Sequence, residues 1–453
     1  MTKTSRLFTP LVASLALLAQ LAAGPALAGP KIEQWTAPTG ARVLYVESRA
    51  LPLVDIQIDF AAGSAFDPAG KAGLASLTQG LLEAGSASLD EQQIADRIAD
   101  IGAQIGGSTE SDRTSLSIRS LSSEAERNAA IELGASLLAQ PTFPEDILER
   151  ERKRALAGLR EALTKPAMLA ARRFNEALYA GHPYGGSVTA ESLESITRDD
   201  VVDFHRRHFG AQRASIAIVG DVDRATAERI AIRLTEQLPP VEAAAPLPAP
   251  APTQATVLRI PNPSAQAHIA VGQAALARED ADYFPLLVGN YVLGGGGFVS
   301  RLTKEVREKR GFAYSVHSYF APQQVAGPFQ ISLQTRGSQA DEALAVVRET
   351  LAGFIAEGPS AEELQAAKDN MINGFGLRLD SNAKILGYVA MIGFYRLPLD
   401  WLDTYPQQVA AVSAEQIRDA FARRIHADRL VTVIAGGDGD KAGAAPATAE
   451  AGK

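Results

Sequence analysis

The strongest constraint on the fold of this chain is a residue pattern that recurs 216 positions further along. In each half one segment opens a helix, and an arginine (Arg213 or Arg429) then leads into an apolar strand. The matching segments are 196–201 with 412–417, 215–220 with 431–436, and 144–148 with 360–364. Three matches in one register predict a duplicated domain, so we expect the same plan to be built twice.

A stretch rich in alanine and proline lies between the two halves. Pro239 and Pro240 are followed by the run AAAPLPAPAP, a composition that favours an extended, semi-rigid linker over 239–254. We therefore expect an N-terminal domain at 29–238 and a C-terminal domain at 255–437. The tail at 438–453 is rich in alanine and glycine, and we expect it to be disordered.

Each half places strands first, then helices, then a closing strand. The clearest strand alternates apolar and polar residues, Val54, Ile56, Ile58 and Phe60 with Asp55, Gln57 and Asp59, which predicts burial on one face only. Hairpins are expected at 105–121 and 313–336, and helices at about 122–140, 144–163 and 168–179. Segregated strands and helices favour an α+β fold with two homologous domains, each a mostly antiparallel sheet with helices on one side.

The first 28 residues have the pattern of a cleavable export signal. Lys3 and Arg6 precede an apolar run at 11–23, and Ala26-Leu27-Ala28 forms a cleavage site of small residues. The run is too short for a membrane anchor, so we expect a soluble protein in the periplasm. A mitochondrial presequence is the alternative, but it would be amphipathic and rich in arginine.

Composition excludes several classes of chemistry. The chain has no cysteine, which excludes disulfides, thiolate zinc sites, cysteine nucleophiles and a lipid on cysteine. The formal charge is −8, and losing the two lysine and arginine charges of the signal makes it −10, which gives no reason to expect nucleic acid. No 18-residue apolar segment follows the signal, so no membrane anchor is expected.

The C-terminal half holds a cation and a phenol that a short turn brings close in sequence. Four glycines at 294–297 precede Ser300, a suitable N-cap for a helix that continues to Arg310 and stops at Gly311. Arg307 lies in the last turn, and Tyr314 enters the next strand. A fixed cation with an O–H donor suits an oxyanion. Alternatively, Arg307 belongs to a solvated basic run and Tyr314 is an ordinary strand aromatic.

The N-terminal half contains a helix at 73–82 with one apolar face. Leu74, Leu77 and Leu81 form a stripe at helical spacing, while Ser76, Gln79 and Gly80 lie off it. Hydroxyl, amide and glycine are neither good zinc ligands nor a general base. These three positions therefore predict no metal site on this helix.

Taken together, these motifs resemble those of the insulinase/pitrilysin-type zinc peptidases, in the short two-domain branch that includes subunits of mitochondrial processing peptidase. The similarity spans nearly the whole chain after the signal. It is carried by Gly63-Ser64 with Asp67, by Gly73-Leu74-Ala75, by Gly181-His182-Pro183-Tyr184-Gly185, by Val219-Gly220-Asp221, by Ser300-Arg301-Leu302, and by the run from Arg307 to Tyr314. The resemblance implies half of a clamshell that closes around peptides.

The departures from that family are confined to the N-terminal half. Ser76, Gln79 and Gly80 stand in place of the inverted H-x-x-E-H motif, and Ala157 stands where the family has its remaining glutamate ligand. The segment Ile105, Gly106, Gly107 and Ser108 matches the substrate-binding edge strand, without its usual Asn-Ala. The resemblance thus implies that this chain binds no zinc or other cofactor.

In contrast, the resemblance assigns a role to the C-terminal pair. In the family an arginine and a tyrosine at this spacing reach a zinc held by another half, and Arg307 and Tyr314 match them. We therefore expect the zinc-free subunit of an exported metallopeptidase, with a homologous H-x-x-E-H subunit that binds zinc as its partner and peptides as substrates. We expect it to be inactive alone. The alternative is a non-catalytic peptide-binding or scaffold protein of the same fold.

Other candidate sites have weaker support. His205 and His208 lie three positions apart on a helix without an acidic ligand beside them. The other four histidines are single residues expected to be structural: His182, His268, His317 and His426. The glycines at 294–297 lack the Gly-Lys-Ser/Thr of a phosphate loop and indicate a hinge at a helix end. Ser381 and Lys384 match S-x-x-K without its companion motifs.

Overall fold

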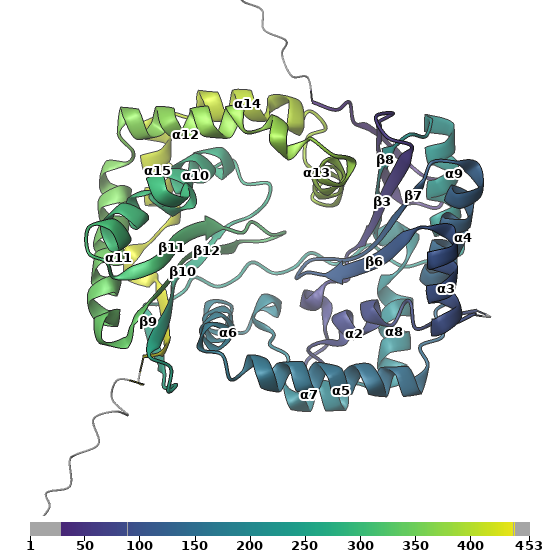
Figure 1. Cartoon of the computed structure of the whole chain (residues 1–453), viewed down its shortest axis with the longest axis horizontal. Coiled ribbons are helices and arrows are strands. Elements are labelled where there is room, and N and C mark those ends of the chain that lie inside the picture. Colours follow the sequence, from purple (N-terminus) through teal and green to yellow (C-terminus); the bar gives the residue numbers. More distant parts are fainter. Residues whose placement is uncertain (1–28, 88, 438, 440–453) are drawn as a thin grey trace, which may run out of the picture.

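The computed structural model describes residues 29–87, 89–437 and 439. The signal predicted at 1–28 and the tail predicted at 438–453, apart from Gly439, lie outside these residues. The described chain forms two α+β domains side by side (Figure 1), which confirms the predicted fold class.

The N-terminal domain is built on a six-stranded sheet in the order β1-β2-β8-β3-β7-β6. Its strands are β1 (Glu33–Thr36), β2 (Arg42–Glu47), β3 (Leu53–Phe60), β6 (Gln104–Thr109), β7 (Thr114–Leu121) and β8 (Ala214–Gly220). Only β2 and β8 run parallel within it. A small ribbon of β4 (Gly85–Ser86) and β5 (Leu89–Asp90) lies apart. The edge strand β6 pairs with β7, as the hairpin predicted at 105–121 requires.

The C-terminal domain repeats this topology in a five-stranded sheet of order β11-β12-β10-β13-β9. Its strands are β9 (Thr256–Ile260), β10 (Gln266–Leu276), β11 (Ala313–Phe320), β12 (Gly327–Arg336) and β13 (Val431–Gly436). The pair β9 and β13 is parallel, as β2 and β8 are, and the other pairs are antiparallel. The edge strand β11 therefore occupies the place that β6 has in the first domain.

Helices follow the same duplication. The N-terminal domain has α2 (Leu74–Gly80), α3 (Glu91–Ile101), α4 (Glu124–Ala139), α5 (Glu145–Ala162), α6 (Pro166–Leu178), α7 (Ala190–Ser195), α8 (Arg198–His208) and α9 (Arg224–Thr235). The C-terminal domain has α10 (Tyr283–Asn290), α11 (Ala340–Glu357), α12 (Ala361–Asn373), α13 (Asn382–Phe394), α14 (Trp401–Ala411) and α15 (Ala414–Arg424). The pairs α4/α11, α5/α12, α6/α13 and α8/α15 each begin 216 residues apart, so the predicted duplication is confirmed.

Local chemistry sets these helix starts in both halves alike. Thr197 accepts a hydrogen bond from Asp200 N at 3.2 Å, and the Asp200 carboxylate accepts one from Thr197 N, which forms a capping box before α8. Ser413 and Gln416 form the same box before α15. Each box satisfies backbone N–H groups that the first helical turn leaves without partners.

The two domains are joined by an exchange of helices. Helix α6 packs on β13 and β10 of the C-terminal sheet, and α13 packs on β8, β3 and β2 of the N-terminal sheet. Figure 1 shows α13 on the face of the N-terminal sheet opposite to α4 and α9. Both faces of each sheet are therefore covered over part of their width, one by the domain's own helices and the other by a helix of its neighbour.

This exchange overturns the prediction that the strand at 53–60 buries only one face. Asp55 and Asp59 are 3% and 0% exposed because the second face lies beneath α13 and its neighbours. Arg119 Nε donates to Asp55 at 2.5 Å, and Arg113 and Gln57 donate to Asp59. Burial raises the pKa of Asp59 to about 6, against the opposing effect of Arg113.

The linker at 239–254 contains no helix or strand and runs between the domains. Every third residue from Val241 to Pro250 is partly buried, which fits the three-residue turn of polyproline II. It is held at several points, including Arg213 Nε to Glu242 O at 2.7 Å and His182 Nε2 with Pro248 O at 2.8 Å. No helix within the described part of the chain is long and apolar enough to cross a membrane.

Candidate functional site

The predicted motif helix is α2, and its start is fixed by Gly73 and Asp67. Gly73 has φ +103°, a left-handed conformation that favours glycine. The Asp67 carboxylate accepts hydrogen bonds from Gly73 N at 2.8 Å and Ala75 N at 2.7 Å. Burial raises the pKa of Asp67 to about 6, while these two hydrogen bonds oppose the shift. The two residues set the angle at which α2 enters the domain.

Helix α2 presents its off-stripe positions outward, as predicted. Leu74, Leu77 and Leu81 are buried, whereas Ser76 and Gly80 are exposed and Gln79 is half-buried. Ala157, on α5, is exposed. A hydroxyl, an amide, a glycine and an alanine supply neither a zinc ligand set nor a proton acceptor, so zinc does not fit these positions. Within residues 29–87, 89–437 and 439, no three His, Cys, Asp or Glu side chains are grouped to hold a metal.

The Gln79 amide lies against the edge strand β6. A Cβ added at Gly107 would come within 2.4 Å of Gln79 Nε2 and 2.1 Å of Ser115 O, so only glycine fits this position. Ile105 and Gly106 are half-buried, while Gly107 and Ser108 are exposed. The outer edge of β6 pairs with no other strand of the described chain. The four predicted substrate-binding residues thus lie on a free edge next to α2.

A helical turn and a strand of the C-terminal domain bring Arg307 and Tyr314 together. Ser300 begins the turn as predicted, with Thr303 N donating to its hydroxyl at 3.5 Å. Residues Thr303–Glu308 are π-helical rather than α-helical. Gly311 ends the helix at φ +63°, also as predicted, and the chain then enters β11.

The Arg307 guanidinium lies between two aromatic rings. Its central carbon is 5.0 Å from the centroid of Tyr314 and 4.9 Å from that of Phe298. Tyr314 is 83% exposed and occupies an irregularity in β11, because Ala313 pairs with Thr335 and Ser315 with Gln334. Such a bulge re-aims a side chain away from the ordinary alternation of a strand. The pair is therefore assembled and open to solvent.

Arg307 differs from three of its four basic neighbours; the fourth, Lys304, is exposed and also forms no ion pair with a described residue. Arg301 pairs with Glu363, and Lys309 and Arg310 both pair with Glu305. Arg307 forms no ion pair with a described residue, and its cation–π contacts take the place of a carboxylate. An uncompensated guanidinium next to a free phenol can stabilise negative charge on an oxygen that arrives from outside this chain.

Sequence reasoning missed Phe298, the second ring against Arg307. Its exposure of 68% is unusual for a phenylalanine, and it directly follows the four glycines at 294–297. An apolar aromatic next to a flexible run was the available signal. The contact itself depends on the π-helical turn, which brings residues 298 and 307 together.

Among the remaining candidates, His205, His208, His182 and Ser381 contact neighbouring residues of the fold. His205 Nε2 bonds with Leu138 O at 2.8 Å, and His208 Nδ1 lies 2.8 Å from an Arg213 nitrogen. Burial is the main cause that lowers the pKa of each of these histidines to about 4. His182 accepts from Tyr184 N, and Ser381 caps α13 by accepting from Lys384 N at 3.5 Å. The glycines at 294–297 span the end of a π-helical turn (Tyr291–Gly295) and the start of a 3₁₀ turn (Gly297–Val299).

Comparisons with known proteins place the whole fold in a family. The family model for insulinase (peptidase family M16) matches residues 42–192, and the model for the peptidase M16 inactive domain matches residues 195–371. A crystal structure of a peptidase M16 inactive domain from Pseudomonas fluorescens is 37% identical, covers 89% of this chain and 97% of that chain, and superimposes with a TM-score of 0.86. This chain belongs to the insulinase family, M16.

Curated relatives of this M16 chain carry two kinds of name. An uncharacterized zinc protease, YmxG of Bacillus subtilis, is 24% identical over 78% of this chain and 86% of its own length. A non-peptidase homolog, YmxG of Helicobacter pylori, is 25% identical over 86% and 91%. The M16 fold is thus shared with chains named as proteases and with one named as a non-peptidase. With Ser76, Gln79 and Gly80 on α2, this chain itself lacks the residues of a zinc centre.

Proposed function

We propose that this chain is the subunit of an exported M16 metallopeptidase that binds no zinc itself. A homologous partner supplies the H-x-x-E-H motif and its zinc, and the two chains close around peptides or unfolded proteins. The observation that carries the proposal is the contrast between the halves. In the N-terminal domain, Ser76, Gln79 and Gly80 on α2 cannot form a zinc centre. In the C-terminal domain, Arg307 and Tyr314 contact each other, and Arg307 forms no ion pair with a described residue.

Arg307 and Tyr314 would act on the reacting peptide bond in trans. The two rings that contact Arg307 hold its guanidinium in place. Unlike a carboxylate, they leave its positive charge uncompensated. The exposed phenol of Tyr314 supplies an O–H donor beside it. When the peptide carbonyl becomes tetrahedral, its oxygen gains negative charge, and a fixed cation with a donor stabilises that charge more than the neutral carbonyl.

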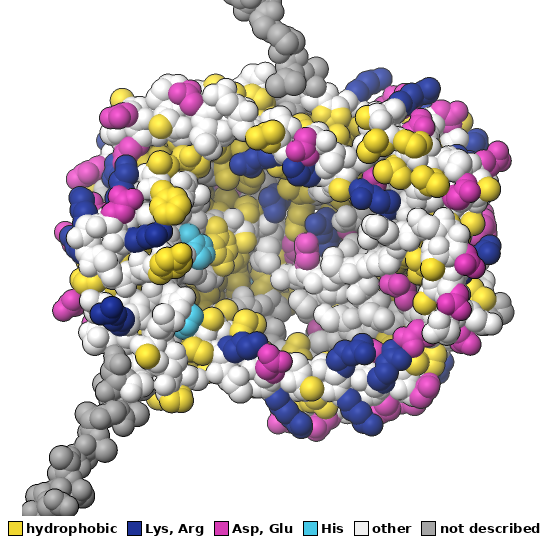
Figure 2. Space-filling model, viewed as in Figure 1, with side chains coloured by type: hydrophobic (Ala, Val, Ile, Leu, Met, Phe, Trp, Pro, Cys, Tyr) yellow, Lys and Arg dark blue, Asp and Glu magenta, His cyan; other side chains and the backbone are white. Residues whose placement is uncertain are grey.

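Peptide binding would use the free edges of the two sheets. Figure 1 shows β6 and the β11–β12 hairpin reaching toward the middle of the molecule, and Figure 2 shows a hollow there. An extended peptide can add to such an edge through main-chain hydrogen bonds, without strict sequence preference. Ile105 to Ser108 form that edge in the N-terminal domain, and Tyr314 lies on the matching edge strand of the other.

The proposal is tested in the complex of this chain with its zinc-binding partner. Arg307→Ala and Tyr314→Phe should each lower kcat for peptide hydrolysis roughly a hundred-fold or more, because each removes a group that stabilises the oxyanion. Arg310→Ala and Tyr319→Phe are matched controls. Arg310 pairs with Glu305, and the Tyr319 hydroxyl donates to Gln330 of the neighbouring strand. Both controls should keep nearly full activity.

Three outcomes would contradict this role. They are hydrolysis by the purified chain alone, full activity of a complex carrying both substitutions, and equal losses in the control variants. A lone chain that binds unfolded peptides tightly, and gains no hydrolysis with any homologous partner, would instead support the non-catalytic peptide-binding alternative. The free edge of β6 is the observation that favours this alternative.

A further inference from the structure

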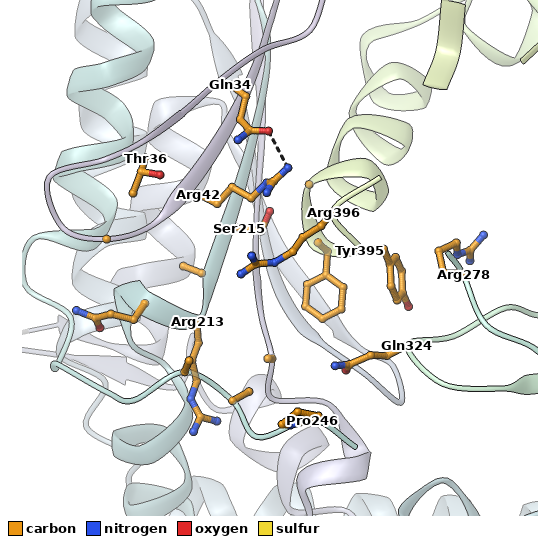
Figure 3. A pocket seen from close by; sticks show the side chains of 18 of the residues that line it. Gln34, Thr36, Arg42, Arg213, Ser215, Pro246, Arg278, Gln324, Tyr395 and Arg396 are labelled. Atoms are coloured by element: carbon orange, nitrogen blue, oxygen red, sulfur yellow. Dashed lines mark hydrogen bonds between the residues drawn. The ribbon is translucent and has the colours of Figure 1, made fainter. Parts of the chain in front are cut away.

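A pocket of about 550 Å³ lies where the two domains and the linker meet. Its walls come from β1 and β2, from the residues just before and at the start of β8, from the linker at 243–246, and from the chain that follows α13. Figure 3 shows these segments converging on one space. The volume is in the range of small-molecule sites, and none of the residues assigned above to peptide chemistry lines it.

Arginines dominate the charge of this pocket. Arg42, Arg213, Arg278 and Arg396 line it, and Glu279 is the one carboxylate among the described lining residues. Glu279 is exposed and forms no ion pair with any of them. None of the four forms an ion pair with a described residue. Arg213 donates to Glu242 O, and Arg278 lies over the Tyr395 ring at 5.2 Å with a buried Nε that has no hydrogen-bond partner within the described chain. Arg42 and Arg396 are the two that lie close together in the pocket (Figure 3).

Arg42 and Arg396 point into the same part of the pocket from different domains (Figure 3). Arg42 donates to Gln34 Oε1 at 2.7 Å, but its Nε is buried without a hydrogen-bond partner within the described chain. The Arg396 side chain forms no hydrogen bond or ion pair to a described residue, whereas its backbone N–H donates to Gly393 O at 3.4 Å. Burial and then the charge of Arg396 lower the pKa of Arg42.

The backbone at Arg396 ends helix α13. Arg396 has φ +55°, the left-handed conformation common just after a helix. Arg396 N donates to Gly393 O at 3.4 Å and Leu397 N donates to Ile392 O at 3.0 Å, which closes the helix end. This turn fixes the place from which the Arg396 side chain enters the pocket beside Arg42 (Figure 3).

We propose that this pocket binds a small oxyanion of two or more charges, a phosphate or carboxylate compound, between Arg42 and Arg396. Planar guanidinium groups match the paired oxygens of both chemistries. The ligand would satisfy the orphan Nε of Arg42 and neutralise the repulsion between the two cations. Phe394 and Pro246 supply apolar wall beside them, and Ser215 and Gln324 supply polar groups for an attached organic part. Because the pocket walls come from both domains, the bound anion would contact both and hold them together.

Calorimetric titration of the purified chain with pyrophosphate and with citrate, in chloride buffer, tests this site. One ion should bind per chain, and the better ligand of the two identifies phosphate or carboxylate chemistry. Arg42→Gln and Arg396→Asn should each weaken binding roughly ten-fold or more, since each removes a charged donor. Asparagine tolerates the left-handed backbone at position 396. Arg160→Gln, an exposed charge on α5 outside the pocket, should bind like the parent chain.

Thermal unfolding separates loss of binding from loss of folding. Without anion, Arg42→Gln should melt at or above the parent temperature, because it removes a half-buried charge that lies beside another cation. With anion, only the parent chain and Arg160→Gln should gain stability. The proposal is overturned if neither ion binds, if both pocket variants bind like the parent chain, or if Arg160→Gln weakens binding as much as they do. None of these outcomes depends on peptidase activity.

Discussion

Gln79 stands where a general base would need a carboxylate, and its amide lies against Gly107 of the edge strand. The chemistry of such a position can be predicted from residue type alone, because an amide takes no proton from water in any fold. Arg307 and Tyr314 could also be selected from sequence. The contacts of Arg307 with the Phe298 and Tyr314 rings, and the absence of a carboxylate partner for Arg307 in the described chain, could not be predicted from sequence.

At the residue scale, His205 should make stability depend on pH. Its pKa in the folded chain is about 4, mainly through burial, against 6.5 when unfolded. Below pH 6.5 the unfolded chain takes up a proton that folded His205 refuses, so stability is lost as the pH falls from 6.5 toward 4. The difference in free energy of unfolding between the parent chain and His205→Gln should therefore fall by roughly 2 kcal/mol when the pH is lowered from 7.5 to 5.

Urea unfolding at both pH values measures this gap. His317→Gln, which changes an exposed histidine, is the control and should show the same gap at both. A gap for His205→Gln that stays constant with pH would contradict the assignment of His205 as a neutral core residue.

At the scale of elements, the helices and strands that followed from sequence are those with local signals. The 216-residue repeat predicted the starts of α5, α8, α12 and α15, alternation predicted β3, and Gly311 predicted the end of the helix before β11. The turns that shape the site did not follow from sequence. Thr303–Glu308 becomes π-helical, with Lys309 N bonding to Lys304 O, and β11 bulges at Tyr314. Both depend on packing against neighbouring strands and helices, which no local pattern records.

The edge strand β6 offers a matched pair of glycines for a stability test. Gly107→Ala should destabilise the chain by about 1–3 kcal/mol, because its Cβ would meet Ser115 O at 2.1 Å and Gln79 Nε2 at 2.4 Å. Gly106→Ala, one residue away, meets nothing within 4 Å and should cost little. Denaturant midpoints of the two variants give the comparison. Equal midpoints would show that α2 and β6 do not approach as closely as described.

At the scale of the whole molecule, a buried carboxylate joins the two domains. Asp112, in the turn between β6 and β7, is 1% exposed. It accepts hydrogen bonds from the Tyr184 hydroxyl, from the Tyr395 hydroxyl at 2.9 Å and from Gln324 N at 2.9 Å. Tyr395 and Gln324 belong to the C-terminal domain. Burial, followed by Asp112, raises the pKa of both phenols, so they remain donors.

Asp112→Ala should lower the free energy of unfolding by about 3 kcal/mol, because it leaves buried donors of both domains unpaired. Calorimetry should also show a broader or divided transition, since the domains lose a shared contact. Asp100→Ala, on the exposed side of α3, is the control and should change little. A single unchanged transition in Asp112→Ala would show that the exchanged helices alone couple the domains.

The sequence by itself determined the duplication, the α+β class, the loss of metal chemistry at Ser76, Gln79 and Gly80, and the choice of Arg307 and Tyr314. These rest on residue identity and on signals within one helix or strand. Only the tertiary structure decided that α6 and α13 cross to the opposite sheet, that Asp55 and Asp59 are buried, and that Arg42 faces Arg396. Those contacts join residues far apart in sequence, and their energies depend on which surfaces pack together, which a one-dimensional pattern does not encode.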